Sequence, residues 1–137
     1  MKQDDTHELV RYRIEQALTA LEDARFLLDG KRSPQSIINR AYYAMFYAAL
    51  ALLQIVSKVP SKHAGVISLF DTEFVIKGVF PKELSRDFHK AFEMRQASDY
   101  RTIKSVSIER ANELPAKAEK FVDSVKEYLL KNELING

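Results

Sequence analysis

Apolar residues in the first thirty positions recur at steps of three and four, which is the spacing of one buried helical face. This pattern predicts a first helix over about residues 7–29. Asp5 followed by Glu8 resembles a capping box at its start, and Gly30 can end it in a left-handed conformation. The predicted buried stripe consists of Val10, Ile14, Ala17, Leu18, Leu21, Ala24 and Leu28.

The next segment predicts a second helix that runs to about residue 56. Ser33 is suited to cap it, and Pro34 suits the first helical position, where no amide hydrogen is needed. Several alanines share the helix with larger apolar residues, so a neighbouring helix can approach it closely. We therefore expect this segment to be the central helix. Its stripe is Ile38, Ala41, Met45, Ala48, Leu52 and Val56.

Three further helices follow from the same reasoning. A third covers about residues 62–77 and ends at Gly78, and a fourth runs from Pro81 to about Ser98. Ser107 can cap a fifth helix. Because proline removes an amide hydrogen, Pro115 should kink this helix or mark its true start.

Taken together, these segments predict an all-α protein. We expect an up-and-down bundle of about five helices in a single domain over residues 1–137, with its core in about 7–130. Residues 101–106 read as a connector, and the tail 132–137 is expected to fray. No strand pattern competes with the helical spacing.

Composition narrows the possible classes of function. Lys plus Arg is 21 and Asp plus Glu is 19, so the net charge of +2 does not mark a dedicated DNA-binding protein. There is no Cys, which excludes disulfide and thiolate chemistry. The start of the chain lacks the apolar stretch of a secretory signal. The most apolar run, 41–56, is shorter than the roughly 20 residues of a membrane span, so we expect a soluble, cytoplasmic protein without membrane contact.

Familiar cofactor and metal motifs are missing from the sequence. The three histidines, His7, His63 and His89, are too scattered for a zinc site by sequence spacing. No glycine-rich phosphate loop and no hydrolase nucleophile turn is present. We therefore expect neither a metal nor a cofactor.

Arg95, Asp99 and Tyr100 form the first candidate cluster. Arg95 and Asp99 are four residues apart and share a helical face, and Tyr100 follows at the helix end. The planar fork of an arginine suits phosphate, and Asp99 could orient it or act as a base. The alternative is an ordinary intrahelical ion pair with Tyr100 packed at the edge of the core.

Lys62 and His63 form the second cluster, at the start of the third predicted helix. Both side chains could face an anion there, helped by the free amides of a helix N-terminus, and Gly65 could allow another backbone to approach. The alternative is a surface basic pair whose imidazole caps a loop.

Asn39, Arg40 and Tyr43 stand near the start of the second helix at spacings that bring their side chains together. If they are buried they need polar partners, and Arg95 or Asp99 could supply them. The neighbouring aromatic residues Tyr42, Phe46 and Tyr47 have helical spacing, which favours core or dimer interface.

Five segments in this order together resemble a HEPN domain (higher eukaryote and prokaryote nucleotide-binding), in particular its small stand-alone prokaryotic branch. The resemblance covers most of residues 9–130. The matching pieces are Asn39-Arg-Ala-Tyr-Tyr43-Ala-Met-Phe, Lys62-His63-Ala-Gly65-Val, Phe70-x3-Phe74-x3-Gly78, Arg95-x3-Asp99-Tyr100 and Ser107-Ile-Glu-Arg-Ala111.

The resemblance implies a helical bundle that forms a homodimer with a shared groove for RNA or nucleotide. Many HEPN proteins are metal-independent ribonucleases with an Arg followed, after four to six residues, by a His. Here Arg95 matches but Asp99 lies near the place of the His, which makes His63 the best candidate for proton transfer. Stand-alone members are often encoded beside a minimal nucleotidyltransferase antitoxin. In some of them this partner modifies a tyrosine of the motif region, here Tyr100.

Three hypotheses about function follow, of which the last is a structural dimer whose polar side chains only satisfy buried groups. The first is a toxin-like protein that binds or cleaves RNA, with Arg95 on phosphate, Asp99 orienting it, and His63 with Lys62 supplying proton transfer or charge. Asn39, Arg40, Tyr43 and Tyr100 would extend the binding surface. The second is a non-catalytic module that binds a nucleotide or a nucleotidyltransferase through the same groove.

Overall fold

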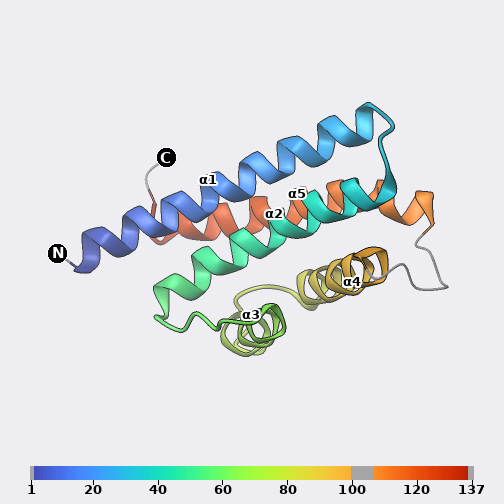
Figure 1. The fold of residues 1–137 in the computed structure, drawn as a ribbon. Helices are drawn as coiled ribbons and strands as arrows, with labels where there is room; N and C mark the ends of the chain where they lie inside the picture. The colour runs from blue at the N-terminus through green and yellow to red at the C-terminus, as the bar shows by residue number, and fades with distance from the viewer. Residues whose placement is uncertain (1, 100–106, 136–137) are drawn as a thin grey trace.

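The computed structural model describes residues 2–99 and 107–135, and within these ranges it contains helices and no strand, which confirms the all-α prediction. Along these two ranges, five α-helices and one π-helical turn follow each other (Figure 1). They are α1 Lys2–Asp29, α2 Pro34–Ile55, α3 His63–Phe70, η1 Asp71–Val75, α4 Lys82–Asp99 and α5 Ile108–Lys131.

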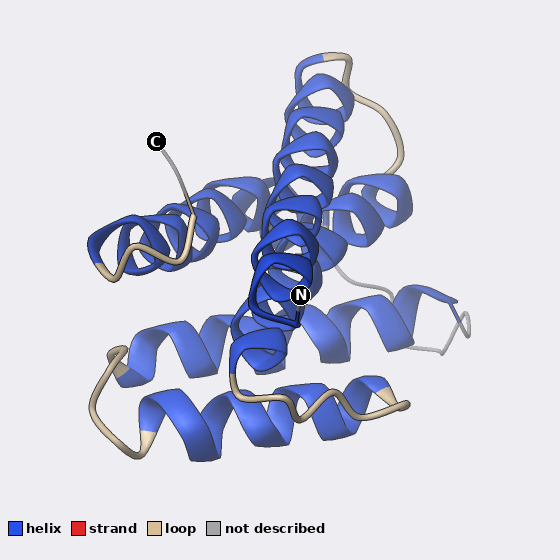
Figure 2. Cartoon of the chain, turned by 90° about the vertical axis from the view of Figure 1, so that its left-hand side faces the viewer, coloured by secondary structure: helices blue, strands red, loops and turns tan. Residues whose placement is uncertain are grey.

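Helix α2 is the centre of the bundle and contacts α1, α3, α4 and α5. Helix α1 runs antiparallel beside it, and α5 packs along it (Figure 1). The α3–η1 segment and α4 lie side by side and cross the direction of α1 (Figure 2). The predicted central position of the second helix is therefore confirmed. Its small residues are fully buried, which is what lets the neighbouring helices approach: Ala41, Ala44, Ala48, Ala49 and Ala51.

Three phenylalanines pack together where α3, α4 and α5 meet. Phe70 of α3, Phe88 of α4 and Phe121 of α5 meet with ring centroids between 5.1 and 5.7 Å apart. All three are almost completely buried. Aromatic pairs at such distances each add about 0.5–1.5 kcal/mol to the burial of their area. These contacts set α3 and α4 against the rest of the bundle, and thereby position the side chains described below.

The ends of α1 differ from the prediction. Because the helix begins at Lys2, Asp5 and Glu8 lie inside it and form no capping box at its start. At the other end Gly30 still donates its amide hydrogen to the Phe26 carbonyl, as in a helix. The left-handed residue is Lys31, with φ 52°, one position later than predicted. The amides of Lys31 and Arg32 bond back to the last turn, which is the Schellman arrangement with lysine in place of glycine.

Serine caps begin α2 and α5, as predicted. The Ser36 amide donates to Ser33 Oγ at 3.3 Å, and the Arg110 amide donates to Ser107 Oγ at 3.2 Å. Since α5 starts directly after Ser107, Pro115 lies inside an unbroken helix, and the suggestion that it marks the true start is wrong.

The third predicted helix, residues 62–77, consists of two parts. The α-helical part ends at Phe70, and Asp71–Val75 then form a π-helical turn. Gly78, with φ 81°, reverses the chain toward α4, in agreement with the prediction that it ends the helix.

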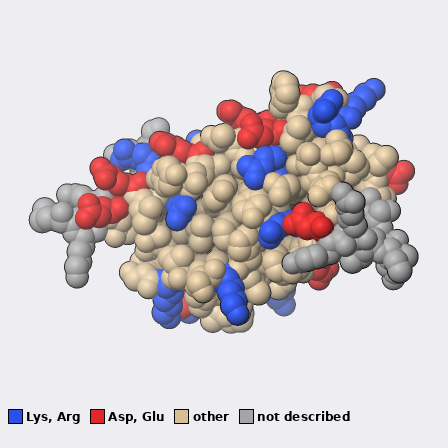
Figure 3. All heavy atoms as spheres, viewed as in Figure 1, with Lys and Arg blue, Asp and Glu red and all other residues tan. Residues whose placement is uncertain are grey.

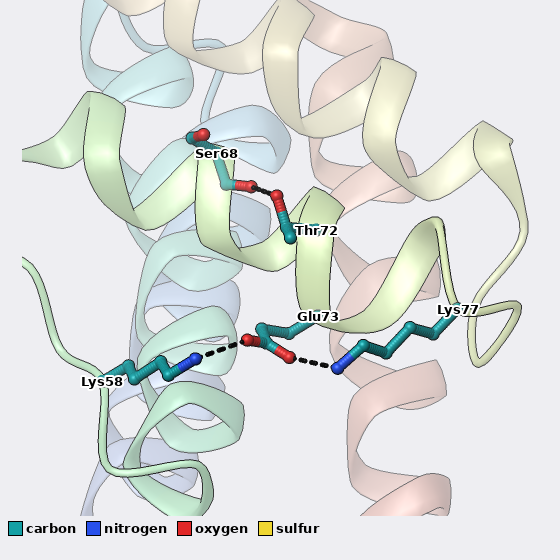
Figure 4. A network of polar contacts seen from close by, with 5 residues as sticks. All are labelled: Lys58, Ser68, Thr72, Glu73 and Lys77. Atoms are coloured by element: carbon teal, nitrogen blue, oxygen red, sulfur yellow. Dashed lines mark hydrogen bonds and ion pairs between the residues drawn. The ribbon is translucent and has the colours of Figure 1, made fainter.

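Figure 4 shows how side chains hold the π-helical turn. Glu73 accepts hydrogen bonds from Lys58 at 3.0 Å and from Lys77 at 2.7 Å, and Thr72 donates to the Ser68 carbonyl at 3.0 Å. Glu73 thereby joins the segment after α2 to the segment after η1. The same hydrogen bonds lower the pKa of Glu73 below its ordinary value.

The last described residues fold back onto the bundle after α5. The Leu134 amide donates to the Leu129 carbonyl at 2.8 Å, and the side chains of Leu134 and Ile135 pack on the core. Two apolar side chains near the end thus cover part of the core. The expected fraying of residues 132–137, of which 136 and 137 lie outside the described residues, stays a prediction. In the described ranges, no helix has both the length and the apolarity to cross a membrane.

Candidate functional site

Side chains from three helices meet beside the start of α3. Tyr42 comes from the middle of α2, His63 is the first residue of α3, and Arg95 lies in the last turns of α4. The Tyr42 hydroxyl lies 2.9 Å from His63 Nδ1, and Arg95 Nη1 lies 3.2 Å from the same nitrogen. Both predicted residues, Arg95 and His63, are thus brought together within one subunit.

Aromatic rings hold the His63 imidazole in place. The Phe46 ring is stacked on it, with centroids 4.1 Å apart and planes at 17°. Tyr42 and Tyr43 approach at 5.8 Å, Tyr43 with its plane at 87° to the imidazole. Because these rings confine the imidazole, its orientation relative to Arg95 is well defined.

Arg95 is held by rings and by one carboxylate. Its guanidinium carbon lies 5.3 Å from the ring centroids of both Tyr42 and Tyr43, within the range of cation–π attraction. Arg95 Nε lies 3.2 Å from Asp99 Oδ2, which is the predicted pair four residues apart. The N–H is not aligned for a hydrogen bond there, and Nε is buried without another partner in the described residues. The Arg95 side chain keeps 24% of its surface exposed, so it is only partly buried.

Burial and charge set the protonation of this cluster. Burial, followed by the positive charge of Arg95, lowers the pKa of His63 below its ordinary value of 6.5, so the imidazole is neutral at neutral pH. Burial raises the pKa of the Tyr42 phenol far above its usual range, and Arg95 only partly opposes this shift. Tyr42 therefore keeps its proton and can donate it in a hydrogen bond.

Asn39 and Arg40 extend the cluster along α2. Arg40 donates two hydrogen bonds to Asn39 Oδ1, from Nε at 3.0 Å and from Nη2 at 2.8 Å. The Arg40 guanidinium lies 5.3 Å from the ring centroid of Tyr43, so Arg40 and Arg95 both flank that ring. A groove of about 360 Å³ opens here between the end of α1, the start of α2 and the end of α4. It is lined by Leu27, Gln35, Ser36, Asn39, Arg40 and Asp99.

Most of the site residues predicted from the sequence gather in this region. They are Asn39, Arg40, Tyr43, His63, Arg95 and Asp99, which share contacts or line the same groove. Lys62 is the exposed residue before α3, and among the described residues it forms no hydrogen bond or ion pair with them. Tyr100 lies outside the described residues.

Tyr42 belongs to the site although the sequence interpretation treated it as core or dimer interface. It is in fact fully buried, but its hydroxyl bonds to His63. The available signal was that a buried tyrosine needs a partner for its hydroxyl, which pointed to a polar neighbour but did not identify it.

The surroundings of the site carry mixed charge. On the face drawn in Figure 3, basic and acidic side chains are interspersed over a largely uncharged surface, without a continuous basic stripe. No three His, Asp or Glu side chains in residues 2–99 and 107–135 gather where they could hold a metal ion.

Comparison with known proteins identifies the family. Residues 10–128 match the HEPN domain. A UPF0332 protein of Thermotoga maritima is 34% identical over 126 residues, covering 92% of this chain and 95% of that protein. Two proteins of Methanocaldococcus jannaschii, named "Putative toxin MJ0605" and "Putative toxin MJ0142", are 37% and 32% identical. These matches cover 91% and 90% of this chain, and 92% and 84% of the two proteins.

Proposed function

This chain belongs to the HEPN domain family, and from that premise we propose that it is a toxin-like protein that binds RNA through its cluster of Tyr42, His63 and Arg95. The names of the two related Methanocaldococcus proteins support the toxin-like part of the proposal. The observation that carries the RNA-binding part is the convergence of Arg95 and His63 beside an open groove. Arg95 Nη1 lies 3.2 Å from His63 Nδ1.

The chemistry of the cluster suits a backbone phosphate. Arg95 is partly exposed, and its planar fork can form paired hydrogen bonds to two phosphate oxygens. Arg40 also contacts the Tyr43 ring and supplies a second positive charge. The next phosphate of an RNA strand can lie beside it. The groove beside Asp99 offers Gln35, Ser36 and Asn39 as hydrogen-bonding groups for a base or sugar.

Metal-independent cleavage of RNA is a second candidate, and the placement of Asp99 favours it. Its carboxylate lines the groove and lies 3.2 Å from Arg95 Nε. As a base, Asp99 would take the proton of a ribose 2′-hydroxyl, whose oxygen then attacks the adjacent phosphorus. Arg95 would stabilise the charge that develops on the phosphate. The 5′-oxygen leaves with a proton from water, which yields a cyclic phosphate and a free hydroxyl.

The proposal includes partners. We propose a homodimer and a nucleotidyltransferase antitoxin, both of which the family resemblance supports. If the same surface binds a nucleotide or that partner and no RNA, the non-catalytic module described above becomes the better interpretation.

Fluorescence anisotropy with a labelled single-stranded RNA in EDTA tests the main proposal. Removing one phosphate contact should weaken binding and reduce the salt slope by about 0.7. We expect this for Arg95→Ala. Arg86→Ala is the matched control, since it removes the same charge from an exposed position on the same helix. Equal affinity of wild type and Arg95→Ala would refute the proposal.

The same samples, analysed on gels, test cleavage. We expect metal-free cutting by the wild type, loss of cutting in Asp99→Asn, and RNA binding that persists in that variant. Binding without any cutting by the wild type would exclude the cleavage candidate and leave the RNA-binding proposal intact.

A further inference from the structure

We infer that Tyr42 and Arg95 hold His63 in the neutral form with its proton on Nε2, so that His63 donates a hydrogen bond to the bound phosphate and transfers no proton. Tyr42 is then a positioning residue for the site. The ligand in this inference rests on the proposed function, whereas the form of the imidazole follows from the contacts of His63 itself.

Counting donors identifies the protonated nitrogen. A guanidinium has only donors, so Arg95 Nη1 can approach His63 Nδ1 at 3.2 Å only if Nδ1 carries no hydrogen. The Tyr42 hydroxyl, at 2.9 Å, then donates to the same nitrogen. A neutral imidazole has one N–H, and with Nδ1 engaged by two donors that hydrogen must be on Nε2.

The charged groups around the imidazole keep it neutral. On the α4 side, the imidazole contacts Arg95, which in turn forms an ion pair with Asp99. From α2 it faces Tyr42 and Tyr43, which contribute rings and hydroxyls but no positive charge. A second proton would place an imidazolium beside the guanidinium in a partly buried position. The lowered pKa of His63 agrees with this balance.

The other side of the ring is where a ligand can bind. Among the described residues no group forms a hydrogen bond with Nε2, and this atom is not one of the buried groups without a partner. Its N–H can therefore donate to a phosphate oxygen on the side of the ring that faces away from Arg95. Because neither ring nitrogen offers a free lone pair, His63 cannot accept the 2′-hydroxyl proton. In the cleavage candidate this assigns the base to Asp99.

Nuclear magnetic resonance of ¹⁵N-labelled protein tests the inference directly. Two-bond ¹H–¹⁵N correlations distinguish a protonated from an unprotonated ring nitrogen. We expect His63 to show hydrogen on Nε2 alone at about pH 7 to pH 8. In Tyr42→Phe combined with Arg95→Ala, which removes both donors to Nδ1, the other tautomer should become detectable. His7 and His89 provide internal references in the same spectra.

RNA affinity tests the role as a donor. The amide of glutamine can replace the Nε2 hydrogen, so His63→Gln should retain most of the affinity, and His63→Ala should lose roughly tenfold or more. Finding His63 charged or protonated on Nδ1 at pH 7, or equal losses in both variants, would overturn the inference. A wild type that shows the expected tautomer but binds no RNA would overturn the proposed function and the phosphate ligand, and would leave the positioning by Tyr42 standing.

Discussion

Gly65, in the first turn of α3, allows a direct test of how that helix is held next to the site. A Cβ atom added at Gly65 would lie 2.9 Å from Pro60 Cβ and 3.4 Å from Pro60 Cγ. Unstrained carbon contacts are about 3.5–4.0 Å. Because the proline ring is rigid and lies in the segment that leads into α3, it cannot rotate away from the added methyl group.

Two opposing effects decide the stability of Gly65→Ala. Alanine in place of glycine stabilises a helix by up to about 1 kcal/mol, and less in a first turn. Overpacking at a confined position costs about 1–3 kcal/mol. The clash outweighs the gain, so we expect Gly65→Ala to lower the free energy of unfolding by about 1 kcal/mol. In a Pro60→Gly background the clash is absent, and the same substitution should stabilise by about 0.5 kcal/mol or more.

Urea denaturation followed by circular dichroism measures all four members of this double-mutant cycle. The cycle cancels the effect of Pro60→Gly on the unfolded chain, so it isolates the contact between the two positions. A stabilising effect of Gly65→Ala that is the same in both backgrounds would show that Pro60 does not restrict this position, and would refute the reasoning.

Three further predictions concern stability. Phe88→Ala removes a fully buried ring and should lower the free energy of unfolding by about 3–5 kcal/mol, read from urea denaturation; a loss below about 1 kcal/mol would contradict the packing of that ring. In the folded protein the pKa of His63 is lower than its ordinary value of 6.5. Below about pH 6.5 the unfolded chain therefore binds more protons than the folded protein. Stability should therefore fall on acidification by at most about 1.4 kcal/mol per pH unit, and urea titrations of His63→Gln should lack this component. The lowered pKa of Glu73 contributes stability above its ordinary value of 4.5 that disappears as the pH falls through its folded value; thermal melts at acidic pH should show this loss in the wild type and not in Glu73→Gln.

Features of the fold that depend on a few neighbouring residues were predictable. The caps at Ser33 and Ser107 involve an amide three residues away, and Gly78 supplies the reversal by itself. The end of α1 was placed one residue early because a Schellman arrangement accepted Lys31 in the left-handed conformation. The π-helical turn was missed because five residues are too few to alter the apolar spacing.

The candidate site also has a predictable part, which depends on neighbouring residues along one helix, and an unpredictable part, which depends on how the helices pack. Arg95 and Asp99 are four residues apart on one helix, so their pairing follows from helical geometry. The contacts of His63 with Tyr42 and Arg95 depend on how α2, α3 and α4 pack, which the spacing of residues along one helix does not determine. Tyr42 was assigned to the core for this reason.

The three helices that supply the site have a consequence for when the site can exist. Its hydrogen bonds join positions 21 and 32 residues apart, so no local segment of the chain can form it. The last part of the chain, α5, covers α2 and supplies Phe121 beneath Phe70 and Phe88. A chain still emerging from the ribosome lacks that support, so the cluster of Tyr42, His63 and Arg95 forms only when synthesis of the bundle is nearly complete.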